Sequence, residues 1–120
     1  MDINKILNEN PSLIARVSEE AEDKRVEWQR AKEIYANKEA LYVMGLKANL
    51  DTLKATEVKY YINSNDELYT LRLELVVLES GYRKREVTFN GLKEQLNAAK
   101  VLARIQMTDK QTIDWAGNIK

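Results

Sequence analysis

The sequence contains no cysteine and no histidine. Without cysteine, neither a disulfide framework nor a thiolate metal site can form. Without histidine, most nucleophile–base pairs and most zinc or iron sites are excluded too, which leaves carboxylates and lysines as the main chemical groups. We therefore expect a protein that is not an enzyme and that binds no metal or other cofactor.

Long hydrophobic runs are also missing. The uninterrupted aliphatic run from Leu75 to Leu78 is far shorter than the roughly 20 apolar residues that span a bilayer. The N-terminal stretch MDINKILNENP has no signal-peptide core, so we expect a soluble protein of the cytoplasm. The 19 basic and 19 acidic side chains cancel, and no general attraction to nucleic acid or to anionic membranes is predicted.

With one proline and four glycines, few positions interrupt a helix. The dipeptide Asn10-Pro11 is typical of a helix start, because Asn10 can cap the helix and Pro11 suits its first turn. From there to about residue 54, apolar residues recur with helical spacing. This pattern predicts an N-terminal segment at 1–10 and a long amphipathic helix over 11–54.

The second half of the chain has a more regular heptad pattern and predicts a coiled-coil-like helix over 65–107. Its apolar residues alternate at spacings of three and four and form the expected seam of the fold, at Leu68, Leu71, Leu75, Leu78, Tyr82, Phe89, Leu92 and Leu96. Arg85 also takes a seam position, which predicts a buried charge or a residue that sets the register. Residues 108–120 are predicted to form a tail or a short helix.

A predicted turn region at 55–64 separates the two helices. It ends in small polar residues, and Ser64 and Glu67 have the spacing of a capping box, in which each residue satisfies a backbone N–H of the other. Neither long helix can bury its apolar stripe alone. We therefore predict an all-α fold, an antiparallel helical hairpin in a single domain over 1–120, completed by oligomerisation into a helical bundle, with a dimer as the simplest case.

Pairing the two helices about the middle of the turn region predicts the contacts across the hairpin. In this register Trp28 lies near Gly91, a large side chain opposite a gap. The acidic run from Glu19 to Glu27 lies near the basic residues Lys93, Lys100 and Arg104. Because the acidic run has no calcium-loop spacing, we interpret it as a solvated surface and not as a metal site.

The candidates for contact with nucleic acid or with a protein partner are basic residues of the second helix, of which Arg83 and Lys84 lie close in sequence to the aromatic residues Tyr82 and Phe89. The candidates are Arg83, Lys84, Lys93, Lys100 and Arg104. Such mixtures are typical of surfaces that bind single-stranded DNA, although the heptad pattern already explains Tyr82 and Phe89 as seam residues. Since the net charge is zero, composition does not favour direct binding of single-stranded DNA.

The stretch ATEVKYYINSNDELYTLRLELVVLESGYRKRE, followed by LKEQLNAAKVLAR, resembles small helical proteins of the early regions of bacteriophages and prophages. These proteins are often encoded beside single-strand annealing recombinases or single-stranded-DNA-binding proteins. The resemblance covers residues 55–104 and implies an accessory protein of recombination or replication that acts through protein contacts in the bacterial cytoplasm. The alternatives are an inhibitor of a host nuclease or anti-phage defence system, and a virion structural component.

Overall fold

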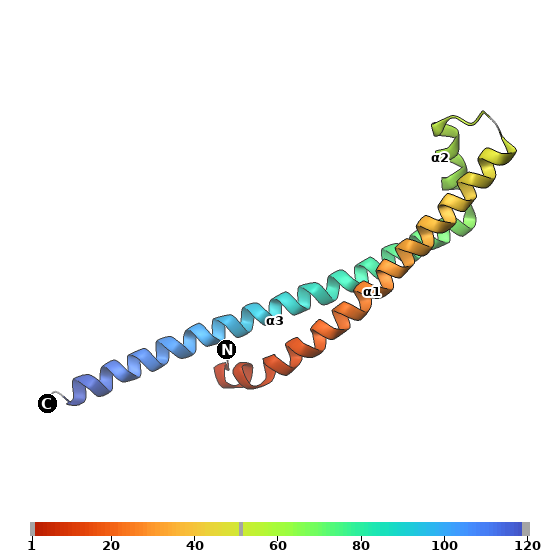
Figure 1. Ribbon diagram of the computed structural model, residues 1–120. Coiled ribbons are helices and arrows are strands. Elements are labelled where there is room, and N and C mark those ends of the chain that lie inside the picture. Colours follow the sequence, from red (N-terminus) through yellow and green to blue (C-terminus); the bar gives the residue numbers. More distant parts are fainter. Residues whose placement is uncertain (1, 51, 119–120) are drawn as a thin grey trace. The chain divides into compact units, whose positions relative to one another are not determined.

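Three α-helices make up the described part of the chain (Figure 1). The computed structural model describes residues 2–50 and 52–118, with side chains up to residue 109. Helix α1 spans Ile3–Asn49, α2 spans Ala55–Ser64 and α3 spans Asp66–Asn118. The two long helices pack against each other, and α2 is the short connector between them. The predicted all-α helical hairpin is therefore confirmed.

The tertiary contacts divide the chain into two units. One unit consists of residues 1–21 and 85–120, and the other of residues 22–84. Both units contain a segment of α1 packed on a segment of α3, and the second also contains α2. Each unit thus has its own apolar seam between two helical segments.

Helix α1 starts at Ile3, before the predicted start at Pro11. The carboxylate of Asp2 accepts the backbone N–H of Lys5 at 3.1 Å and so satisfies one donor that the first turn leaves free. Asn10 is not a cap but a buried residue inside the helix, and Pro11 lies in the helix interior. A proline there removes one backbone hydrogen bond, and the buried side chains of the preceding turns offset that loss.

Helix α3 is continuous from Asp66 to Asn118 and runs through Gly81 and Gly91 without a break. No glycine of the described residues has a positive φ angle. Residues 108–118 continue α3 and do not form a separate tail or short helix. The first long helix ends at Asn49, earlier than predicted, and the predicted turn region folds as α2.

The observed register differs from the predicted one. In the unit of residues 22–84, Trp28 stacks on Tyr82 with ring centroids 5.7 Å apart, so Trp28 does not face Gly91. A second pair, Lys38 and Glu67, lies closer to the turn and shows that the segments run antiparallel. These pairs are symmetric about the link after Asn49 and not about the middle of α2. The register shifted because the chain already reverses before α2 begins.

Burial along α3 follows the heptad spacing. Leu68 is 2% exposed and Ala99 is 0% exposed. The seam positions between them are half-buried, at Leu71, Leu75, Leu78, Tyr82, Arg85, Phe89, Leu92 and Leu96. Because only two helical segments share each seam, no large side chain among those described is completely buried. Several large apolar side chains consequently remain on the outer surfaces, among them Val76 and Val101.

Candidate interaction surface at the turn

A single residue, Asn65, joins α2 to α3. Its backbone is extended, with φ −78° and ψ 119°, and its N–H donates to the carbonyl oxygen of Ile62 at 3.3 Å. Its side-chain oxygen accepts the backbone N–H of Leu68 at 2.9 Å, which makes Asn65 the N-cap of α3. The predicted cap was Ser64, but Ser64 is the last residue of α2 and the cap lies one position later.

The C-terminal end of α2 is held by side chains from both long helices. The hydroxyl of Tyr42 on α1 donates to the carbonyl oxygen of Tyr61 at 3.4 Å. The guanidinium of Arg72 on α3 donates to the carbonyl oxygen of Ile62, also at 3.4 Å. Carbonyls in the last turn of a helix have no partner within it, and a cation there is favoured by the helix dipole. These contacts tie α2 to both α1 and α3.

Arg72 also binds α1 directly, because its Nη1 atom donates to the hydroxyl of Tyr35 at 3.2 Å. Burial raises the pKa of the Tyr35 hydroxyl above its ordinary value. The hydrogen bond from Arg72 acts in the opposite direction, while a hydrogen bond to the Glu39 carboxylate raises the pKa of Tyr35 further. Arg72 is thus the residue that links all three helices, and Tyr35 is kept neutral beside it.

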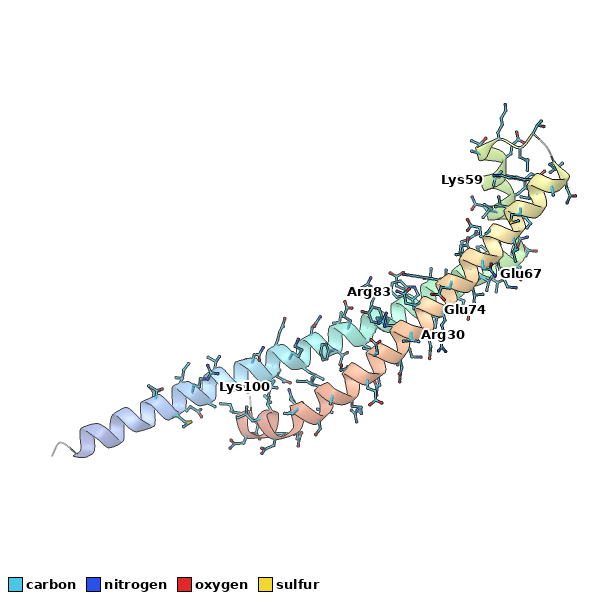
Figure 2. The ribbon with its side chains drawn as sticks, viewed as in Figure 1. Arg30, Lys59, Glu67, Glu74, Arg83 and Lys100 are labelled. Carbon is cyan, nitrogen blue, oxygen red and sulfur yellow. The ribbon has the colours of Figure 1, made fainter. Side chains whose placement is uncertain are left out.

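Lys38 on α1 and Glu67 on α3 form an ion pair across the seam, with 2.7 Å between Nζ and Oε1. Figure 2 labels Glu67 near the start of α3. The Lys38 side chain is 47% exposed and that of Glu67 is 67% exposed, so the pair stabilises the fold by at most about 1 kcal/mol. Glu67 was predicted to reach back to Ser64 in a capping box, but its carboxylate accepts the hydrogen bond from Lys38.

These residues border a groove of about 320 Å³ at the turn end of the unit. It is lined by Lys38, Leu41, Tyr42, Asn65, Glu67 and Leu68. Leu41 is 58% exposed, and Met44, one helical turn further along α1, is 66% exposed. The groove therefore combines an apolar floor and flank with an ion pair at its rim, an arrangement suited to holding an apolar side chain of another molecule.

Tyrosine side chains are exposed on the connector and at the start of α3. Tyr60 and Tyr61 make an edge-to-face contact on α2 with 5.9 Å between their ring centroids. Tyr60 is 69% exposed and Tyr69 is 53% exposed. Exposed tyrosines supply rigid contact area with a polar tip, which is why they are frequent at protein interfaces.

Arg83, a predicted contact residue, lies on an aromatic pair of its own unit. Its guanidinium carbon is 5.5 Å from the ring centroid of Trp28 and 5.4 Å from that of Tyr82. Lys32 approaches the Trp28 ring as well, at 3.4 Å from the centroid. Arg83 appears in Figure 2 beside this part of α1, and its contacts are cation–π interactions that stabilise the packing of α1 on α3. The neighbouring Lys84 is exposed.

The other basic candidates lie together on one side of α3, in the unit of residues 1–21 and 85–120. Lys93, Lys100 and Arg104 are exposed and spaced seven and four residues apart, which places them on the same side of a helix. Lys93 also lies over the Phe89 ring, 5.0 Å from its centroid. Lys100 is labelled in Figure 2. We call Lys93, Lys100 and Arg104 the basic stripe of α3.

Members of the acidic run form ion pairs along their own helix. Glu22 accepts two hydrogen bonds from Arg25, at 2.6 and 2.9 Å, and this contact lowers the pKa of Glu22 below its ordinary value. Glu27 pairs with Lys24 at 3.3 Å. The predicted attraction across the hairpin was based on a register about the middle of the turn region, which the pairs Trp28–Tyr82 and Lys38–Glu67 do not follow.

Arg85 is half-buried at its seam position. The sequence did not indicate the hydrogen bond between the buried Asn10 and Gln95 in the same unit, or the role of Arg72. Asn10 does fall on the apolar stripe of α1, a signal that the following proline obscured. Arg72 has no comparable signal, because its role depends on where the end of α2 lies.

Among the described residues there is no group of three acidic side chains placed to hold a metal ion. Nor is any described helix apolar over a length that would cross a bilayer. No protein-family model, curated protein or solved structure matches the chain.

Proposed function

We propose that the protein is a non-enzymatic helical module that binds a protein partner through the turn end of the unit of residues 22–84. The groove beside Leu41 and Met44 carries this proposal. Exposed apolar side chains at a concave surface with a polar rim are typical of protein interaction sites. The contacts of Arg72 and Tyr42 hold the groove's walls in place, so a partner would meet a preformed surface.

The partner that we propose is a protein of DNA recombination or replication. This part of the proposal is supported by the resemblance of residues 55–104 to phage early proteins. That segment forms part of the groove, because Asn65, Glu67 and Leu68 line it. An inhibitor of a host nuclease or a virion component would use the same surface on a different partner.

The test is a binding titration with purified single-strand annealing recombinase and single-stranded-DNA-binding protein. The variant Leu41→Glu/Met44→Glu places two charges beside the groove and should weaken binding at least tenfold, because charged groups would have to be buried at the interface. Val87→Glu is the matched control, since Val87 is 71% exposed on the other unit. Binding to neither protein, or equal binding by both variants, would contradict the proposal.

Direct contact with single-stranded DNA is a second candidate function, and the basic stripe of α3 favours it. Three cations on one side of a helix, one of them over an aromatic ring, combine the two features of a single-strand binding surface. We propose the basic stripe, and not Arg83, as the DNA contact, because Arg83 already packs on Trp28 and Tyr82.

We would measure binding to labelled single-stranded DNA across a salt series. The variant Lys93→Ala/Lys100→Ala/Arg104→Ala should lose affinity and reduce the salt dependence, because fewer counterions are released when fewer phosphates are neutralised. Arg16→Ala/Arg30→Ala removes exposed cations of α1 and should change little. If the wild-type protein does not bind, or if the two variants behave alike, the stripe has no such role.

A further inference from the structure

A second apolar surface lies on α3, on the side of the helix opposite the seam. It consists of Tyr69, Leu73, Val76 and Val77, which are 53%, 50%, 64% and 69% exposed. At about 100° per residue, these positions fall on one side of the helix, while the seam residues Leu68, Leu71 and Leu75 fall on the other. We call these four residues the outer face of α3.

The outer face contains no charged residue, although 32% of the chain is charged. Ser80 continues it by one turn, and the charged residues on this side are at its ends, Asp66 at one end and Arg83 and Lys84 at the other. Asp66 lies one turn before Tyr69, and Lys84 lies one turn after Ser80. A helix that is apolar on two opposite sides is expected to be covered on both. In the unit of residues 22–84, the seam side packs against α1, whereas the four side chains of the outer face are at least half exposed.

We propose that a second copy of this chain covers the outer face, with the two α3 helices antiparallel and related by a twofold axis near Val76. In this arrangement Asp66 of each copy lies opposite Lys84 of the other. A parallel arrangement would instead place Asp66 against Asp66 and Lys84 against Lys84, which is unfavourable. The charges at the two ends are therefore complementary to those of a second copy in the antiparallel direction.

The sizes of the side chains agree with this pairing. Across the twofold axis, Leu73 lies opposite Val77, and Tyr69 lies opposite Ser80, so that the largest side chain meets the smallest. A twofold interface is isologous and needs a surface that is complementary to itself under the rotation. The outer face meets this requirement in charge and in size. Because the outer face is short and buries a small area, we expect a dimer that dissociates at micromolar concentration.

This inference does not rest on the proposed function, because the groove at Leu41 and the outer face are formed by different residues. The absence of cysteine allows a direct test with single-cysteine variants and a short bifunctional maleimide. Tyr69→Cys mixed with Ser80→Cys should form cross-linked dimers, while either variant alone should not. Cross-linking of either variant with itself would show a parallel pair, and no cross-linking in any sample would show a free face. Both results would overturn the proposal.

The molar mass from sedimentation equilibrium supplies the second test. Val76→Glu should raise the dimer dissociation constant at least tenfold, whereas Ile34→Glu, at a 51% exposed position of α1, should leave it unchanged. Lys84→Asp should weaken the dimer, and the double variant Asp66→Lys/Lys84→Asp should restore it, because the opposite charges are then exchanged. Helix content is compared by circular dichroism. A wild-type monomer at all concentrations, or no rescue by the charge exchange, would refute the antiparallel dimer.

Discussion

The side-chain amide of Asn10 donates a hydrogen bond to Oε1 of Gln95 at 3.0 Å and joins α1 to α3 within the unit of residues 1–21 and 85–120. Asn10 is only 5% exposed, and its Nδ2 atom also lies 3.4 Å from the carbonyl oxygen of Leu92. A buried amide at the seam of two helices tolerates few alternative alignments, because a shifted register would leave it without a partner. Asn10 therefore sets the register of this unit.

We predict that Asn10 and Gln95 are energetically coupled. Asn10→Ala should lower the free energy of unfolding by about 1–2 kcal/mol, and a double-mutant cycle with Gln95→Ala should give a coupling of about 1 kcal/mol, the net value of one hydrogen bond. The measurement is urea unfolding followed by circular dichroism. Strictly additive effects would mean that the two amides contribute independently.

Arg72 is predicted to hold α2 in place. Arg72→Met keeps the aliphatic part of the side chain but removes the donors to Tyr35 and Ile62, and should cost about 1–3 kcal/mol. Amide hydrogen exchange should become faster in residues 55–64 than in the rest of the unit. Arg30→Met, at an exposed position of α1 that Figure 2 labels, is the control and should leave exchange in α2 unchanged. Unchanged protection of α2 in the Arg72 variant would contradict this role.

Tyr35 should make stability depend on pH in the alkaline range. Its folded-state pKa is raised by burial, so the neutral hydroxyl contributes stability that is fully present below the unfolded-state pKa of about 10. That contribution is lost as the pH rises through the higher folded-state pKa. Unfolding curves from about pH 8 to about pH 11.5, a range that brackets the ordinary tyrosine pKa, should show a steeper loss of stability for the wild type than for Tyr35→Phe. Parallel profiles would mean that the phenol titrates alike in both states.

Two glycines should be replaceable by alanine with a gain in stability. A Cβ atom at Gly45 or Gly91 would meet nothing within 4 Å, and neither residue has a positive φ. Since glycine is about 0.8–1.0 kcal/mol less favourable than alanine inside a helix, each substitution should raise the free energy of unfolding by about that amount. Ala36→Gly, at an exposed position of α1, should lower it by a similar amount. A loss of stability in Gly91→Ala would indicate that a partner approaches the helix at that position.

Much of the fold was predictable because it depends on local spacing. The alternation of three and four residues from Leu68 to Leu96 places the apolar side chains on one side of a helix whatever packs against them, and burial follows that spacing. The low content of proline and glycine likewise predicted long helices. The lack of cysteine and histidine excluded whole classes of chemistry, because a residue type that the chain does not contain cannot act in any fold.

The ends of the helices were harder to predict, because tertiary packing competes with local signals. Asn10-Pro11 has the composition of a helix start, yet the burial of Asn10 against α3 holds the helix together through the proline. Ser64 and Asn65 are both residue types that can cap a helix. Because Ser64 is the last residue of α2, the N-cap of α3 is Asn65.

The residues alone determined that this protein is built from long amphipathic helices, since periodicity is a property of neighbours along the chain. The tertiary structure decided which residues meet. The pairing of Trp28 with Tyr82, the place of Arg72 between three helices and the groove at Leu41 all depend on α1 ending at Asn49 and the chain reversing before α2. Contacts between helices are set by the reversal point, and a shift of a few residues there changes every pair along the seam.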